Sequence, residues 1–358
     1  MSDVYRQLIA EPSAWTPADL RADPNWDLKL DDTQAGDLVT ALHKANRLGL
    51  ALPEIDAHNF DIGRCVPVAK AIQAQLRNGR GMALLHNFPV AGHTRKDIER
   101  MYWGFCAHLG TGVTQNSDSS LIHYVTEGKL RPNQGTRGVG NPGTVSLHVD
   151  LADCVSLLCV RQAKDSPPSR LSSSTTLHNE LLRRAPDVLE RLYGGFIWDR
   201  QNEHAQTETP TSAYHVPFFS QRDGQISCRY NRHWITRAAD RRGGFSADDI
   251  ALLDMIDELT HANCFEFNFQ PGDLQFANNY TCLHGRAPHA PATSEDDARL
   301  LMRIWFDIQD MRKFSDAAIV RYGIIRHGRL GWTAAQLQAG LEGRLHARRV
   351  HDQAPYVS

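Results

Sequence analysis

Apolar runs rich in β-branched residues recur between residues 111 and 308, with no helix placed regularly between them. The clearest runs are residues 155–160 and 299–308, and residues 264–283 alternate apolar and polar side chains around a Pro-Gly-Asp turn. A doubly wound parallel sheet needs a crossover helix between successive strands, and that rhythm is absent. A strand-rich sequence without regularly spaced crossover helices is typical of an antiparallel double-sheet roll. We therefore predict a mainly β fold with helices.

Helical patterns are concentrated in the first eighty residues. Apolar residues at helical intervals predict helices over residues 35–48 and, more weakly, 65–76. Later helices are predicted over residues 94–109, 174–192 and 246–261, and short strands over residues 195–198 and 226–230. The chain lacks a long linker or internal repeat. We therefore expect a single catalytic domain, residues 1–358, with a helical part (1–80), a core with inserts (about 81–312) and a C-terminal extension (313–358).

Charge and cysteine content narrow the class of partner. The 39 Lys and Arg residues nearly balance 41 Asp and Glu residues, which argues against nucleic acid as the main partner. No apolar run approaches the ~20 residues that span a bilayer, and the N-terminus lacks the pattern of a signal peptide. Seven scattered cysteines without a CxxC pair fit a reducing compartment. We expect a cytoplasmic protein that acts on a small-molecule substrate and does not bind a membrane. The sequence leaves open whether the protein is a homo-oligomer.

A His-x-Asp motif is the strongest chemical signal in the sequence. On a strand, residues i and i+2 project from the same face, so His148 and Asp150 can chelate one metal ion. His284, which follows a Pro-Gly-Asp turn and a strand, supplies a third ligand. Two histidines and a carboxylate on one face are the ligand set of non-haem Fe(II) oxygenases. His289 is the nearest competitor for His284.

A second match to the motif is His178-Asn-Glu180. It lies in a segment with a helical pattern, where i and i+2 diverge by about 200°, so these two residues are not expected to share a metal ion.

Two arginines follow His284 in a predicted strand. Arg299 and Arg303 are four residues apart, so a strand places both on one face. If they are buried among the neighbouring apolar side chains they need anionic partners, and guanidinium groups bind carboxylates well. The alternative is an exposed edge strand with solvated arginines.

These segments resemble the taurine dioxygenase-like (TauD/TfdA) family, which includes clavaminate synthase and uses Fe(II) and 2-oxoglutarate. The resemblance covers roughly residues 115–312 and rests on HVD, the segment LSSSTTLHNELLRRAPDVLERLYGGFIWDR, PGDLQFANNYTCLHGRAP and RLLMRIWF. It implies a double-stranded β-helix (jelly-roll) core with helical insertions. It also implies that His148, Asp150 and His284 are the iron ligands.

The same resemblance implies roles for several other residues. Arg299 matches the arginine that binds the distal carboxylate of 2-oxoglutarate, and Arg303 matches one that often contacts the anionic group of the substrate. Ser169, or alternatively Ser172, is expected to touch the distal carboxylate, although prolines replace the Gly-Gly pair usual before it. Gln115 and Asn116 resemble a polar pair that lines the pocket, with Asn116 bonded to the cosubstrate or the substrate.

Two neighbouring segments have open interpretations. Arg229, Tyr230, Arg232 and Trp234 are either a second substrate anchor or a strand end with a packed aromatic ring. Residues 126–143 are either a lid over the pocket or a plain surface loop.

The implied reaction couples 2-oxoglutarate and O2 to oxidation of a substrate C–H bond, most simply hydroxylation, with release of succinate and CO2. Asp150 disfavours halogenation, because related halogenases have a small non-ligating residue there. The expected substrate is a small anionic or amino-acid-like molecule, and one tethered to a carrier protein is left open. The alternatives are a zinc hydrolase using the same triad and a catalytically silent jelly-roll binding protein.

Overall fold

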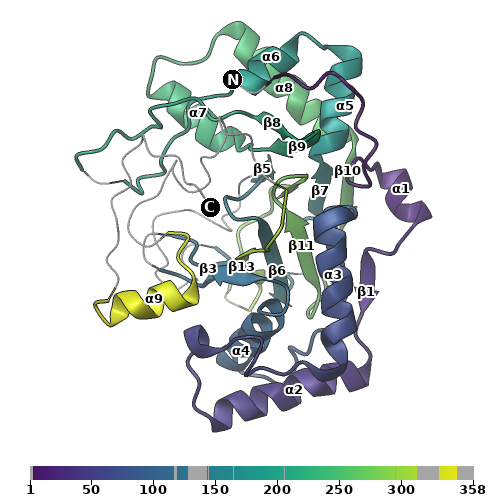
Figure 1. The fold of residues 1–358 in the computed structure, drawn as a ribbon, viewed down its shortest axis with the longest axis vertical. Coiled ribbons are helices and arrows are strands. Elements are labelled where there is room, and N and C mark those ends of the chain that lie inside the picture. The colour runs from purple at the N-terminus through teal and green to yellow at the C-terminus, as the bar shows by residue number, and fades with distance from the viewer. Residues whose placement is uncertain are drawn as a thin grey trace.

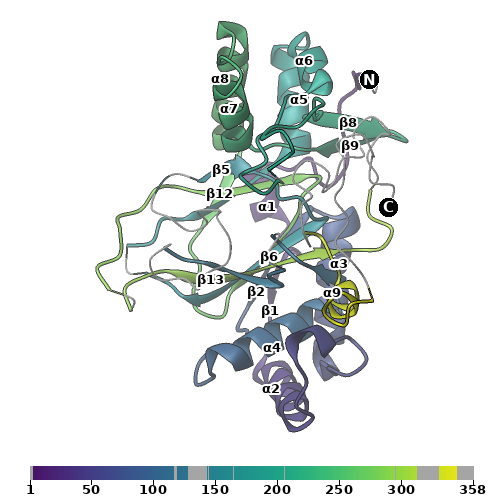
Figure 2. The same cartoon turned by 90° about the vertical axis from the view of Figure 1, so that its left-hand side faces the viewer.

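Two β-sheets lie one above the other at the centre of the molecule, with helices on both outer sides (Figure 2). The computed structural model describes residues 3–116, 119–127, 143, 145–163, 165–204, 206–294, 296–312 and 330–344. The predicted mainly β fold with helices is confirmed. Most of the predicted C-terminal extension and of the 126–143 segment lies outside the described residues.

The larger sheet has seven strands in the order β1-β2-β11-β6-β13-β3, with β4 also paired to β13. Every pair is antiparallel except β1 with β2. The strands are β1 (Asp27–Lys29), β2 (Met82–His86), β3 (Thr111–Val113), β4 (Ile122–Val125), β6 (Cys154–Arg161), β11 (Leu274–Asn278) and β13 (Leu300–Asp307).

The smaller sheet has four antiparallel strands in the order β10-β7-β12-β5. They are β5 (Val145–His148), β7 (Ser169–Ser173), β10 (Cys264–Phe267) and β12 (Cys282–Arg286). A separate hairpin pairs β8 (Phe219–Arg222) with β9 (Gln225–Cys228).

Helices cover the two outer faces (Figures 1 and 2). On the larger sheet lie α2 (Asp32–Arg47), α3 (Val66–Asn78) and α4 (Arg95–Cys106); beyond the smaller sheet lie α5 (Ser174–Arg184), α6 (Val188–Gly194), α7 (Arg232–Asp240) and α8 (Ala247–Ala262). The remaining helices are α1 (Pro17–Ala22), α9 (Ala334–Leu341) and the 3-10 turns Leu52–Glu54 and Gly63–Cys65. Within the described part of the chain, every helix is too short or too polar to span a bilayer.

Strand β13 shows how the sequence separates the two faces of the larger sheet. Its even-numbered side chains, Leu300 to Phe306, pack into the core shared with α2, α3 and α4. Arg303 and Trp305 point to the opposite face, toward the smaller sheet. Because successive strand residues project to opposite sides, one apolar strand supports the helical layer and also carries polar groups inward.

The sequence reading is wrong for two short segments. Residues 195–198 contain one isolated bridge, Phe196 to Val216, instead of a strand. Arg232 and Trp234, considered above as a strand end, lie in the first turn of α7. The signal for that helix was present: the Asn231 side chain accepts a hydrogen bond from the main-chain N–H of Trp234, as N-cap residues do.

His86 ties three strands together at the edge of the larger sheet. Its Nδ1 lies 2.7 Å from Asp273, next to β11, and its Nε2 lies 2.7 Å from Asp27 in β1. The hydrogen bond to Asp273 is the main cause that raises the pKa of His86 to about 8, and Asp27 adds to it.

We predict that this cluster makes stability pH-dependent. Because the folded-state pKa lies above the unfolded value of about 6.5, the stabilisation is full below pH ~6.5 and is lost as pH rises through about 8. Chemical denaturation at pH 6 to 9 (about five points) should show a steeper loss of unfolding free energy for the wild type than for His86→Gln. Parallel profiles would contradict the assignment.

Candidate active site

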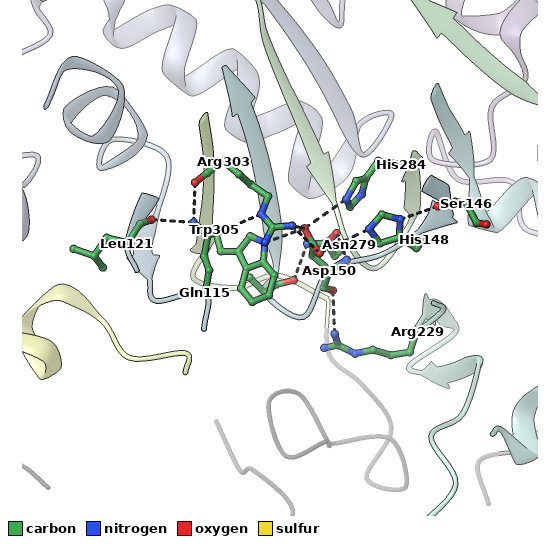
Figure 3. A network of polar contacts seen from close by, with 11 residues as sticks. Gln115, Leu121, Ser146, His148, Asp150, Arg229, Asn279, His284, Arg303 and Trp305 are labelled. Atoms are coloured by element: carbon green, nitrogen blue, oxygen red, sulfur yellow. Dashed lines mark hydrogen bonds and ion pairs between the residues drawn. The ribbon is translucent and has the colours of Figure 1, made fainter. Parts of the chain in front are cut away.

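His148, Asp150 and His284 lie together between the two sheets (Figure 3). His148 ends β5, His284 lies in the middle of β12, and the antiparallel register pairs the two residues directly. His148 Nε2 is 3.9 Å from Asp150 Oδ1, and His284 Nε2 is 3.5 Å from Asp150 Oδ2. One ligand atom of each residue lies within 4.8 Å of the other two. The three residues are thus positioned to surround one ion.

Main-chain hydrogen bonds fix the turn that carries Asp150. The Asp150 N–H donates to Asn279 Oδ1 at 3.0 Å, and the Asn279 side chain donates in turn to the carbonyl of Ala152. Arg229 donates to the carbonyls of Asp150 and Leu151, at 3.2 and 3.0 Å. Asn279 was missed by the sequence reasoning. Arg229, considered there as a substrate anchor, holds the ligand turn.

The His148 imidazole is in the form that a metal ion requires. The Ser146 carbonyl lies 2.8 Å from His148 Nδ1, which directs Nε2 toward Asp150. Burial, and then the neighbouring His284, lower the pKa of His148 to about 4, so its ring is neutral at neutral pH. His284 Nδ1 is buried without a partner among the described residues. A His-Asp-His donor set fits Fe(II).

Asp150 is a buried carboxylate that the protein keeps ionised. Burial by itself raises its pKa, but Arg303 and His284 hold the pKa well below its usual range. Arg303 Nη1 lies 3.3 and 3.5 Å from the two carboxylate oxygens, and Trp305 donates to Oδ2 at 2.9 Å. With Oδ2 bonded to Trp305, Oδ1 is the oxygen left to face an ion.

Gln115 holds Arg303 in this position. It accepts a hydrogen bond from Arg303 Nε at 2.8 Å and donates to the Arg303 carbonyl at 2.7 Å (Figure 3). Arg303 lies on the wall of the cavity, whereas Gln115 does not line it. The structure therefore places Gln115 behind the arginine and not in contact with a substrate.

Arg299 and Ser169 form a second polar cluster in the same cavity. Arg299 Nη2 donates to Ser169 Oγ at 2.9 Å, while Arg299 Nε has no partner among the described residues. Burial, and then the nearby Arg286, lower the pKa of Arg299 to about 10. Two buried guanidinium groups this close favour a bound anion. Of the two candidate serines, Ser169 lines the cavity and Ser172 does not.

The cavity has a volume of about 700 Å³, within the roughly 300–1,000 Å³ typical of small-molecule sites. Its lining includes the triad, Arg299 and residues of the first two turns of α7. Arg232 lines it, but its guanidinium is paired with Asp254 and Asp257 at 2.6 Å each. Asn116 does not line it, and its side chain bonds to Ser120 instead.

The competing histidines lie elsewhere. His178 is buried in helix α5, where its Nε2 lies 3.2 Å from the Tyr193 hydroxyl, and Glu180 pairs with Arg183 and Arg184. His289 is partly buried, and its Nδ1 lies 2.8 Å from the carbonyl of Ala290. Neither belongs to the His148 cluster, as the sequence reasoning predicted for His178.

Two curated proteins are similar to the chain over most of its length. It is 27% identical to FR-33289 synthase of Streptomyces rubellomurinus over 322 residues, 88% of this chain and 94% of that protein. It is 24% identical to the taurine hydroxylase-like protein SAT17 of Stachybotrys chartarum, over 83% of this chain and 79% of that protein.

Solved structures share the fold. One is an asparagine oxygenase in complex with Fe(II), 3-hydroxyasparagine and succinate (TM-score 0.60, 17% identity, 78% of this chain and 93% of that one). Another is the non-haem iron oxygenase OrfP in complex with Fe and α-ketoglutaric acid (TM-score 0.58, 15% identity, 85% and 100%). The family model for the taurine catabolism dioxygenase TauD, TfdA family matches residues 48–305. The chain therefore belongs to the TauD/TfdA family of iron- and 2-oxoglutarate-dependent oxidoreductases.

Proposed function

We propose that this protein oxidises, most simply hydroxylates, a C–H bond of a small anionic substrate, using Fe(II), 2-oxoglutarate and O2. The observation that carries the proposal is that the triad and the Arg299–Ser169 cluster open into one cavity between the sheets. We also propose that the two sheets are a jelly roll and that the chain acts as one catalytic domain. One core unites the N-terminal helices with the larger sheet, which supports the single domain.

In this proposal each polar cluster has a distinct task. His148, Asp150 and His284 hold the iron on one face, and Arg299 with Ser169 binds the distal carboxylate of 2-oxoglutarate. When bound, iron and 2-oxoglutarate activate O2 and supply the oxidant, with release of succinate and CO2. The contribution of the protein is to decide which substrate carbon faces the iron.

The alternatives explain less of the cavity. A zinc hydrolase would use the same triad, but it has no need for the buried pair Arg299 and Arg286. A silent binding protein would not need a buried carboxylate kept ionised between two histidines.

The first prediction concerns the metal. Anaerobic addition of Fe(II) and then 2-oxoglutarate to the metal-free protein should produce a visible charge-transfer band. His148→Ala should abolish the band and succinate formation, because only two of the three protein ligands would remain to hold the iron. His289→Ala is the matched control and should leave both unchanged. Full turnover by His148→Ala would contradict the ligand assignment.

The second prediction concerns the cosubstrate. Arg299→Gln should raise the KM for 2-oxoglutarate by about 30-fold or more, because a buried charge-assisted pair is lost. Ser169→Ala removes one hydrogen bond from a hydroxyl group to the distal carboxylate and should raise the same KM about tenfold. Ser172→Ala should have no effect on this KM, and a larger effect there than at Ser169 would reverse the choice between the serines.

The third prediction concerns Trp305, which we propose orients the Asp150 carboxylate. Trp305→Phe should weaken Fe(II) or Mn(II) binding about tenfold, in the range of partners that orient metal ligands. Metal affinity is measured by equilibrium titration of the metal-free protein. Trp26→Phe is the control, since Trp26 is also buried and loses a comparable bond, to the Leu20 carbonyl, away from the cavity. Equal metal affinities for the Trp305 variant and the wild type would reject this role.

A further inference from the structure

The walls of the main cavity carry an excess of positive charge. Among the described lining residues, one side chain is acidic, that of Asp150. Five arginines line the same cavity: Arg232, Arg237, Arg286, Arg299 and Arg303. A cavity charged in this way concentrates anions, because low-dielectric walls focus the field.

Four of these arginines already have a partner or an assigned ligand. Arg303 pairs with Asp150, and Arg232 pairs with two carboxylates of α8, Asp254 and Asp257. Arg299 is assigned the distal carboxylate of 2-oxoglutarate in the proposed function, and Arg286 donates to the carbonyls of Gly143 and Ala287. Arg237, on the second turn of α7, is the arginine that these pairings leave.

The guanidinium of Arg237 is only weakly compensated. Its nearest carboxylate oxygen belongs to Asp199, 3.7 Å from Nε, and the same carboxylate lies 2.5 Å from Arg241. Arg237 Nη1 also donates one long hydrogen bond, 3.4 Å, to Gln201 Oε1. The side chain is 36% exposed, so it lies at the open end of the cavity. Asp199 therefore pairs mainly with Arg241. The charge of Arg237 is left largely uncompensated and is available to a ligand.

The residues around Arg237 hold its side chain in place and carry further hydrogen-bond donors for a ligand. Asp199 is fully buried and accepts from both the main-chain and side-chain N–H groups of Gln201, at 2.7 and 2.8 Å. Gln201 and Asn202 both adopt left-handed backbone angles, φ 54° and 62°, which non-glycine residues hold only at some cost. The buried carboxylate thus fixes the turn on one side of the opening and the arginine on the other.

We propose that Arg237, with Gln201, Asn202, His233 and Thr236, forms an oxyanion subsite that binds the acidic group of the substrate. This subsite rests on the proposed function and extends it: the substrate is a small molecule with a carboxylate, sulfonate or phosphate-type group held at the α7 end of the cavity. The carbon to be oxidised lies toward His148 and His284. The substrate anchor proposed here is Arg237 and not Arg303, because Arg303 is already paired with the Asp150 carboxylate.

The test uses simple anions on the loaded enzyme. Protein preloaded anaerobically with Mn(II) and 2-oxoglutarate, so that the Arg299 site is filled, is titrated calorimetrically with acetate, methanesulfonate and methyl phosphate. At least one anion should bind to the wild type with a Kd of about 1 mM. Arg237→Gln should weaken that binding about tenfold or more, and Arg237→Lys should restore part of it.

Arg242→Gln is the matched control, because Arg242 is exposed, lies two residues beyond the end of α7 and does not line the cavity. It removes the same charge and should change the anion Kd less than twofold. Equal binding by Arg237→Gln and the wild type, an equal loss in Arg242→Gln, or displacement of 2-oxoglutarate by the anion would each overturn the subsite.

The failure of the proposed function gives a different signature. If the proposed function is wrong, a parallel sample with Fe(II) will form no visible band with 2-oxoglutarate. The anion titrations are then repeated on the metal-free protein. A loss of anion binding specific to Arg237→Gln would then still support the subsite, and the absence of such a loss would reject it.

Discussion

The site depends on one constraint, the burial of the Asp150 carboxylate as an anion. A buried charge is stable only when surrounding groups compensate it. Here Arg303 and Trp305 reach it from β13, the two imidazoles approach it from β5 and β12, and its main chain is tied to Asn279 and Arg229. Segments far apart in the sequence must therefore be in place before the three ligand side chains converge.

Strand β13 joins this site to the rest of the fold. Its even-numbered residues bury an apolar face against the N-terminal helices, while Arg303 and Trp305 point between the sheets. The same period of two that makes the strand a good core element sets the spacing of its inward polar groups. The helices that cover the larger sheet thus pack against the outer face of β13. This packing fixes the strand that carries Arg303 and Trp305 and favours a preformed site.

The sequence predicted the parts of the site that follow from local periodicity. The spacing predicts His148 with Asp150, and Arg299 with Arg303, as same-face pairs, so spacing and family resemblance sufficed to find them. In the structure Asp150 lies two residues beyond the end of β5, and Arg299 directly precedes β13. The partners of Asp150 arise from tertiary packing. No local pattern shows that Asn279 and Trp305 will meet Asp150, or that Gln115 will meet Arg303. Asn116 was expected in the pocket for its place beside Gln115, yet its side chain closes a local turn with Ser120. Arg232 was named as a candidate substrate anchor and does line the cavity, but Arg237 was missed because the segment was not recognised as a helix, although Asn231 gave a capping signal.

A crystal structure of the Mn(II) and 2-oxoglutarate complex, with anomalous diffraction recorded at the manganese edge, tests the central claim most directly. The claim is that one ion is shared by His148, Asp150 and His284 in the cavity that Arg299 closes. We expect a single strong anomalous peak within coordination distance of His148 Nε2, Asp150 Oδ1 and His284 Nε2, with the distal carboxylate of 2-oxoglutarate on Arg299 and Ser169. A peak elsewhere, or 2-oxoglutarate bound away from Arg299, would contradict it.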